Sequence, residues 1–130
     1  MELVKIDINE LKDIYSLDCF EKEFRKVVGE IWKQDPPFLR YQKKLLIDLA
    51  VLDDLKENAV KLPEFERLTD EVGLFSIRHP HSTLNLRVIY TIEEGVVILI
   101  IVFLEKNKND YNKAIKVSRK RRKWIISDAL

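Results

Sequence analysis

Cysteine, glycine and proline are scarce in this chain. Its 130 residues include one cysteine, three glycines and four prolines. The lone Cys19 excludes an internal disulfide and is compatible with a reducing cytoplasm. The longest apolar run, Val96–Leu104, is too short to cross a bilayer as a helix. The N-terminus lacks the basic start and apolar core of a signal peptide. We therefore expect a cytoplasmic protein with no membrane partner.

Sequence motifs for several kinds of chemistry are also missing. No set of cysteines and histidines has the spacing of a metal site. Neither a P-loop nor a Rossmann glycine pattern occurs, and there is no Gly-x-Ser-x-Gly nucleophile elbow. The sequence therefore predicts neither a metal nor a cofactor.

What the chain does have is apolar sequence in regular patterns. Apolar residues make up 46% of it, and its length fits one domain, 1–130. Leucines at three- and four-residue steps predict a helix over about 37–58 that packs on a sheet. Strands are expected at about 73–79, 84–92 and 96–104. The short turn before the last strand makes the final two antiparallel, and the almost wholly apolar last strand should be central and covered on both faces.

The first 36 residues predict a largely helical N-terminal extension. Alternation at Val4, Ile6 and Ile8 suits a short edge strand. Asn9 is positioned to cap a short helix through about residue 15. Asp18, with a glutamate three residues later, has the pattern of a capping box for a second helix.

The order of elements predicts an α+β fold. We expect a small antiparallel sheet of three to four strands, with helices on one face and a cationic groove on the other. A last, basic helix should begin at a cap formed by Asn109 or Asp110 and run to about residue 126.

Charge is distributed unevenly along the chain. Residues 1–70 carry 12 Lys/Arg and 16 Asp/Glu, and residues 71–105 carry two and four. Residues 106–130 carry nine Lys/Arg and two Asp/Glu, a balance of +7. This local excess indicates an anionic partner, although a solvated helix face that keeps the protein soluble has the same pattern.

Arg87 is the most informative single cation, because it lies between apolar neighbours in the middle of a predicted strand. Burial of an unpaired guanidinium is costly, so its side chain must face an open groove or a carboxylate. The carboxylates available for an ion pair are Glu93, Glu94 and Glu105. Both interpretations stay open at this point.

Other polar residues cluster near strand ends and on the last helix, where one phosphate could contact several of them. The ends of the strands carry Arg78, His79, His81, Lys106 and Lys108. The last helix adds Tyr111, Lys113, Arg119 and Arg122.

Several segments resemble a family of bacterial toxins in their order and spacing. They are Leu46–Glu57, Leu68, Gly73–Arg78, Leu86–Tyr90, Val97–Phe103 and the stretch from Lys106 onward. Over about residues 42–124 the chain resembles RelE/HigB-type toxins of toxin–antitoxin systems. The phage-derived HigB-like branch of the RelE/ParE superfamily is the most similar.

The resemblance implies an activity and partners. Members of this superfamily are mRNA endonucleases that act on the ribosome without a metal. The substrate's own 2′-OH attacks the adjacent phosphate, which leaves a 2′,3′-cyclic phosphate. The implied partners are the ribosome, mRNA and a small antitoxin, expected to be a helix-turn-helix DNA-binding protein.

The resemblance also implies roles for individual residues. Arg87 matches a strand arginine that clamps phosphate, Arg78 a basic residue on the preceding strand, and Lys106 the cation after the last strand. Tyr111 matches an aromatic residue that stacks on or orients the nucleotide. His79 is a candidate acid or base, since histidine titrates near neutral pH. The RNA-binding candidates are Lys108, Lys113, Arg119, Arg122 and His81.

The chain departs from the family in three places. Residues 1–36 are longer than the usual single strand, Glu105 stands where many members have a second lysine, and the basic C-terminal run is extended. The superfamily also includes gyrase inhibitors. The competing hypothesis is therefore a protein of this fold that cleaves nothing, either a gyrase-type toxin or an inactive phage remnant.

Overall fold

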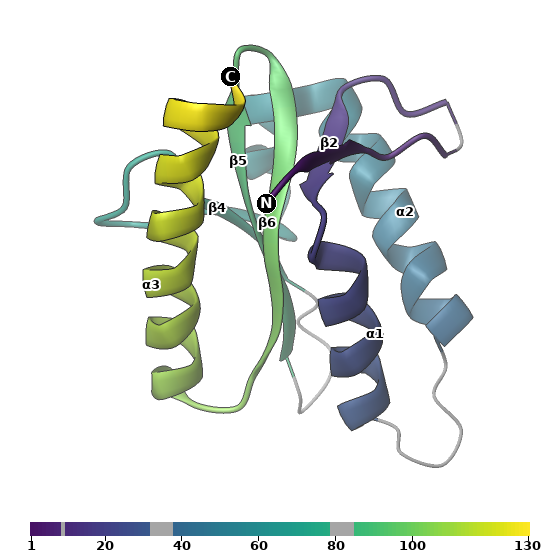
Figure 1. Ribbon diagram of the computed structural model, residues 1–130. Helices are drawn as coiled ribbons and strands as arrows, with labels where there is room; N and C mark the ends of the chain where they lie inside the picture. Colours follow the sequence, from purple (N-terminus) through teal and green to yellow (C-terminus); the bar gives the residue numbers. More distant parts are fainter. Residues whose placement is uncertain (9, 32–37, 79–84) are drawn as a thin grey trace.

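A mixed β-sheet forms the middle layer of the protein (Figure 1). The computed structural model describes residues 1–8, 10–31, 38–78 and 85–130. Over these residues the sheet has six strands in the order β1-β2-β6-β5-β4-β3. The strands are β1 (Leu3–Lys5), β2 (Ile14–Leu17), β3 (Phe65–Arg67), β4 (Phe75–Arg78), β5 (Asn85–Glu93) and β6 (Val96–Glu105). Neighbouring strands are antiparallel except for β2 and β6, which are parallel.

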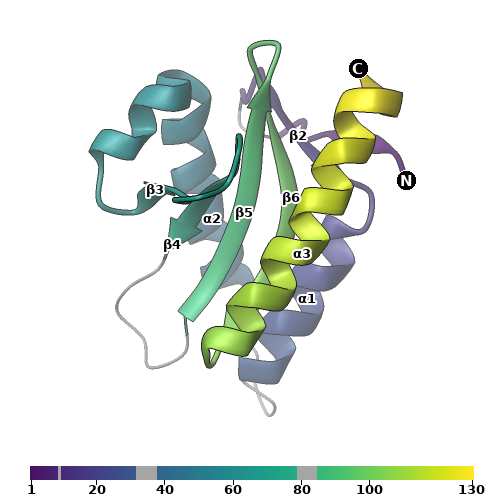
Figure 2. The same ribbon diagram turned by 90° about the vertical axis from the view of Figure 1, so that its left-hand side faces the viewer.

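Helices cover both faces of this sheet. Those described are α1 (Phe20–Ile31), α2 (Phe38–Leu55) and α3 (Lys108–Trp124), with a 3-10 segment η1 (Lys56–Lys61) and a terminal π-helical segment η2 (Ile125–Ala129). Helices α1 and α2 lie on one face, and α3 lies along the other beside β5 and β6 (Figures 1 and 2). None of the described helices combines the length and apolarity needed to cross a membrane.

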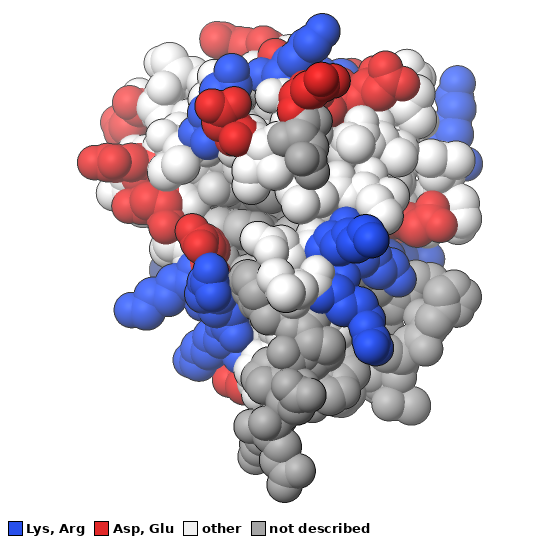
Figure 3. All heavy atoms as spheres, turned by 90° about the vertical axis from the view of Figure 1, so that its right-hand side faces the viewer, with Lys and Arg blue, Asp and Glu red and all other residues white. Residues whose placement is uncertain are grey.

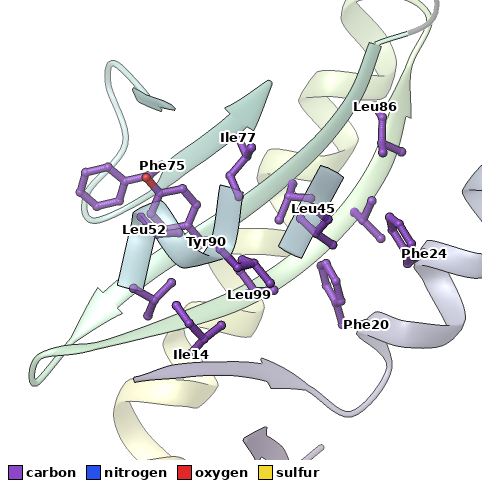
Figure 4. Close-up of a cluster of buried hydrophobic side chains, with 14 of the residues drawn as sticks. Ile14, Phe20, Phe24, Leu45, Leu52, Phe75, Ile77, Leu86, Tyr90 and Leu99 are labelled. Carbon is purple, nitrogen blue, oxygen red and sulfur yellow. The ribbon is translucent and has the colours of Figure 1, made fainter. Parts of the chain in front are cut away.

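The two helical layers bury two separate apolar cores. Under α1 and α2 the sheet contributes residues such as Leu86, Val88 and Tyr90. Figure 4 shows Leu86 and Tyr90 in this core. Under α3 it contributes Ile89 and Ile98. Alternate residues of β5 therefore face opposite sides of the sheet. The prediction that β6 is central and covered on both faces is confirmed.

An irregularity in the pairing of β5 and β6 changes which face the end of β6 presents. Ile89 pairs with Ile101, but Tyr90 pairs with Leu99, so Ile100 is an extra residue in β6. Ile100 and Ile101 both belong to the core under α3. This is a β-bulge, which inserts one residue and shifts the period-two alternation beyond it. Phe103 consequently packs against the α3 core as well.

Sequence patterns located the last strands and the long helix well. The helix expected over about 37–58 is α2, and the strands expected near 73–79, 84–92 and 96–104 are β4, β5 and β6. Glu94 and Gly95 form the turn between β5 and β6, with φ of 51° and 80°. Positive φ at both central residues defines the hairpin turn that matches strand twist.

The expected sheet had too few strands and was expected to be purely antiparallel. The α+β class is confirmed, but the sheet has six strands and is mixed, because β2 pairs in parallel with β6. The helices expected on one face are α1 and α2, and the expected basic C-terminal helix, α3, covers the other face, where a cationic groove was expected. Two of the strands, β1 and β3, have three residues each, too few to show a clear alternation.

The N-terminal expectation was wrong in its helical content. The segment expected to form a helix through residue 15 contains the start of β2, and Ile14 and Leu17 are fully buried. The edge strand is present but shifted to Leu3–Lys5. The second expected helix is α1. Parallel pairing with β6 forms between distant residues, which local propensity cannot report.

Asp53 anchors the loop that leads into β2. Its carboxylate accepts hydrogen bonds from the backbone N–H groups of Lys12 and Asp13, at 2.9 and 2.8 Å. Lys56 Nζ lies 3.4 Å away and adds a third contact. Burial raises the pKa of Asp53, but these hydrogen bonds and the Lys56 charge outweigh it and leave the pKa below its usual value. The ionised form therefore stabilises the junction of α2 with the sheet.

The packing of α2 predicts a large cost for truncating Leu49, which is 1% exposed. Leu49→Ala should lower the free energy of unfolding by about 2–5 kcal/mol, as other core truncations do. Ile47 on the same helix is 59% exposed, so Ile47→Ala should change it by less than about 0.5 kcal/mol. Denaturant melts measure both. Equal effects would show that this face of α2 is not core.

The Asp53 contacts predict a pH-dependent contribution to stability. Because its folded pKa is lowered, this contribution is complete above the unfolded pKa of about 3.9 and is lost as pH falls through the folded value. Asp53→Asn should cost about 1–3 kcal/mol at pH 7. The gap between variant and wild type should be smaller at a pH below the unfolded pKa of about 3.9 than at pH 7. Denaturant melts at the two pH values test this, and a gap that does not change with pH would contradict it.

Candidate functional site

Two arginines lie directly opposite one another on adjacent strands. Arg78 of β4 is the register partner of Arg87 of β5. Like charges at opposed positions destabilise a sheet, so this pair is a local cost that folding does not require. Such a cost is expected at sites that serve function rather than stability.

Each arginine has a carboxylate beside it, on the neighbouring strand that lies away from the other arginine. Arg78 Nε lies 3.2 Å from Glu66 Oε2 on β3, and Arg87 Nε lies 2.8 Å from Glu105 Oε2 at the end of β6. Neither Nε makes a well-directed hydrogen bond to a described residue. The contacts are therefore ion pairs held by charge. From β3 to β6, the four side chains form a row in which two guanidinium groups lie between two carboxylates.

Arg87 thus satisfies both of the interpretations that its sequence left open. Its side chain is 11% exposed and is paired with Glu105, one of the three expected carboxylates. It also lines an open cavity of about 440 Å³. Three cations, two carboxylates, an amide and a phenol line this cavity: Arg87, Lys106, Lys108, Glu66, Glu105, Asn107 and Tyr111.

The start of α3 forms one wall of the cavity and is fixed by a capping box. The Asn107 side chain accepts hydrogen bonds from the N–H groups of Asn109 and Asp110, and the Asp110 carboxylate accepts from the N–H of Asn107. It also accepts from the N–H of Lys106, at 3.0 Å. The N-cap is therefore Asn107 rather than Asn109 or Asp110. The cap fixes the backbone positions from which the side chains of Lys106 and Lys108 project.

Tyr111 projects from the first turn of α3 toward Arg87. The guanidinium carbon lies 5.3 Å from the centre of the tyrosine ring, a cation–π distance. Burial raises the pKa of the Tyr111 phenol, although the Arg87 charge opposes the shift. The phenol is therefore a neutral hydrogen-bond donor at physiological pH.

The structure brings only some of the predicted site residues together. Arg87, Lys106, Lys108 and Tyr111 share the cavity. Arg78 adjoins it through Glu66, and Lys113 is exposed on α3. His79 and His81 lie outside the described residues.

Arg119 and Arg122 lie away from the cavity and hold α3 against the rest of the protein. Arg119 Nε and Nη2 donate to the two oxygens of Glu71, at 2.5 and 2.7 Å. Arg122 Nε donates to Glu93 at 3.0 Å and to Thr91 Oγ1 at 3.3 Å. Gly73 packs against Arg122, because a Cβ there would lie 2.6 Å from the guanidinium.

Arg121 makes a third attachment of α3, between the two helical layers. Its two terminal nitrogens donate to the Glu23 carboxylate on α1, at 3.1 and 3.0 Å, and one also donates to the Ile100 carbonyl. Three arginines of the basic run are therefore structural. The charge that sequence analysis assigned to an anionic partner is to this extent neutralised within the protein.

Sequence reasoning missed two cavity residues, Glu66 and Asn107, and considered Glu105 as a counterion and as a departure from the family pattern. Glu66 lies in β3, a strand that the sequence analysis did not predict. Its alternation with buried Phe65 was the available signal, but a three-residue strand carries it weakly. Asn107 directly follows the predicted strand-end lysine, where a capping residue is common.

Comparison with known proteins identifies no relative. No family model matches the chain, and neither a curated protein nor a solved structure does. Among the described residues, no group of three or more His, Cys, Asp or Glu side chains is placed to hold a metal ion.

The Glu105 ion pair predicts that this carboxylate weakens anion binding. A charge about 4 Å from a bound phosphate contributes roughly 1 kcal/mol even in water. Glu105→Gln should therefore tighten the binding of adenosine 3′,5′-bisphosphate about five-fold, as measured by calorimetry. Glu94→Gln makes the same change in net charge at the far end of β5 and should have no effect. Equal tightening by both would point to net charge alone.

Proposed function

We propose that this chain is the toxin of a type II toxin–antitoxin pair and that it cleaves mRNA on the ribosome. The observation that carries the proposal is the open cavity that brings together Arg87, Lys106, Lys108 and Tyr111. They come from a strand, the end of another strand and the start of a helix. The resemblance of the sequence to RelE/HigB-type toxins implies catalytic roles for three of these residues, Arg87, Lys106 and Tyr111.

The cavity offers charge where phosphoryl transfer develops it. Attack by the 2′-OH forms an O2′–P bond and breaks the P–O5′ bond, and negative charge accumulates on the non-bridging oxygens between the two events. Arg87 is held by a rigid strand and by Tyr111, so it can stabilise that charge with little reorganisation. Guanidinium can hold two phosphate oxygens at once, which suits this role better than an ammonium does.

Proton transfer needs one acceptor and one donor beside the phosphate. Among the described cavity residues, Glu66 and Glu105 are the carboxylates that can accept the proton of the 2′-OH. Lys106 and Lys108 are exposed at the rim and can donate to the departing 5′-oxygen. Tyr111 offers a ring on which a neighbouring base can stack and a phenol that can donate to phosphate.

A second candidate is a protein of the same general kind that binds a partner without cleaving RNA. The observation that favours it is the pairing of Arg87 with Glu105, since a bound phosphate must compete with this carboxylate. A gyrase-inhibiting toxin or an inactive phage remnant would need no accessible guanidinium. The antitoxin and the ribosome belong to the first proposal only as proposed partners.

Arg87 gives the sharpest test of cleavage. Arg87→Ala should reduce mRNA cleavage on translating ribosomes about 10²–10³-fold, by analogy with the loss of one preorganised oxyanion donor. Arg87→Lys should recover only part of this loss, because an ammonium is a point charge. Rates are measured with purified full-length protein and mapped by primer extension.

A matched control and a thermal melt make the result interpretable. Arg67 is an exposed arginine on β3 outside the cavity lining, so Arg67→Ala should cleave at the wild-type rate. A folded Arg87→Ala variant with wild-type activity would refute the assignment. An unfolded one would show that the ion pair with Glu105 is primarily structural.

Pulse labelling separates the two candidate functions. If the protein cleaves mRNA, protein synthesis should fall before DNA synthesis after expression is induced, and the reverse order would favour a gyrase-type target.

A further inference from the structure

The outer face of α3 carries a row of lysines that none of the contacts above involves. Lys113, Lys116, Lys120 and Lys123 are all exposed. At 3.6 residues per turn they lie within about 80° of one another around the helix. The buried side chains of α3, Ala114, Ile115 and Ser118, are on the opposite side. We call these four residues the lysine row.

The lysines of the row form no ion pair with a described carboxylate, unlike the arginines beside them, although Lys123 lines a cavity that Asp70 and Glu71 also line. The arginines at 119, 121 and 122 are each bound to a glutamate. No described carboxylate forms an ion pair with a lysine of the row. The sequence from 111 to 127 contains no Asp or Glu. The basic run therefore divides by residue type, with arginines as structural contacts and lysines facing solvent.

A face that only maintains solubility normally mixes charges of both signs. The opposite side of the molecule has that mixed character, with Lys/Arg and Asp/Glu both on the surface over α1 and α2 (Figure 3). Helix α1, for example, interleaves Lys22 and Lys26 with Glu21, Glu23 and Glu30. The single sign of the lysine row is thus a property of α3 and not of the whole surface.

We propose that the lysine row binds the phosphate backbone of double-helical RNA. From Lys113 to Lys123 the row extends about 15 Å along a straight helix, and compact ammonium groups contact phosphates without reading sequence. The row is convex, and no aromatic residue is among its four members. Single-strand sites instead combine a groove with aromatic stacking, and A-form duplexes are recognised mainly by shape and backbone.

An anionic membrane is the other polyanion to consider, and the geometry of α3 argues against it. A helix that lies in a membrane interface inserts an exposed apolar face into the lipid. The apolar face of α3 is already packed on the sheet, with Ala114, Ile115 and Ile125 in the core. A rigid duplex can be contacted by the ammonium groups alone.

This contact goes beyond the proposed cleavage and does not depend on it. The row lies on the outside of α3, whereas the cavity lies between the start of α3 and the sheet. A protein with both would hold structured RNA on the helix and a separate phosphate in the cavity. The two activities can therefore be removed separately.

The test compares two quadruple variants of the full-length protein. One changes Lys113, Lys116, Lys120 and Lys123 to Gln. The control changes Lys22, Lys26, Lys43 and Lys44 to Gln, which are exposed lysines of α1 and α2, and gives the same net charge. Binding to a fluorescent RNA duplex of about 20 base pairs is measured across salt concentrations. Each lost phosphate contact should reduce the slope of log K against log salt by about 0.9, as for duplex DNA.

The row variant should lose about three to four units of slope while its thermal melt stays unchanged, and the control should keep the wild-type slope. Equal losses in both variants would overturn the proposal in favour of net charge. It would also fail if the row variant lost binding to phosphatidylserine–phosphatidylcholine vesicles but not to the duplex, or bound single-stranded RNA more weakly and the duplex as before. Arg87→Ala should leave duplex binding intact, so failure of this proposal can be told from failure of the cleavage proposal.

Discussion

Strand β6 can be stable only if both of its faces are covered, and much of the architecture follows from this requirement. Its residues from Val97 to Val102 are all buried, and fully burying one such side chain is worth about 1.5–3 kcal/mol. One layer of helices cannot supply that burial. The protein therefore places α1 and α2 on one side and α3 on the other, and it protects the edges of β6 with β2 and β5. The candidate site lies where this strand ends and the covering helix begins.

The charges of α3 follow the different chemistry of arginine and lysine. A guanidinium is planar, weakly hydrated and able to bind a carboxylate through two nitrogens. Arg119 and Arg121 do this with Glu71 and Glu23. An ammonium is compact and strongly hydrated, so lysines remain toward water. A helix with a positive charge at more than a third of its positions can therefore pack closely on a sheet without a large uncompensated charge at the contact.

Prediction from sequence succeeded where a long local pattern existed and failed where distant residues had to pair. The apolar neighbours of Arg87 predicted its place within a strand, and Glu105, with which it pairs, was one of the three carboxylates proposed as a partner. Leucine periodicity found α2, since 18 residues give the period several repeats. In contrast, β2 has four residues and depends on β6, far along the chain. Strand β3 has only three residues, too few to show a pattern, and Glu66 was missed because its role follows from the pairing of β3 with β4.

The bulge at Ile100 has a consequence for how the chain can vary. It acts as a one-residue change of phase: everything before it keeps one alternation and everything after it keeps the other. The face on which Glu105 meets Arg87 is thus set five residues earlier, in the middle of the apolar core. Ile100 itself has no partner on β5, so its removal would leave Ile89 and Tyr90 paired with Ile101 and Leu99, and the end of β6 would keep its faces while losing the local bend. Removal of a paired residue beyond the bulge, such as Val102, would instead move every later residue of β6 to the opposite face. Strand β6 can therefore lose a residue at the bulge more easily than beyond it.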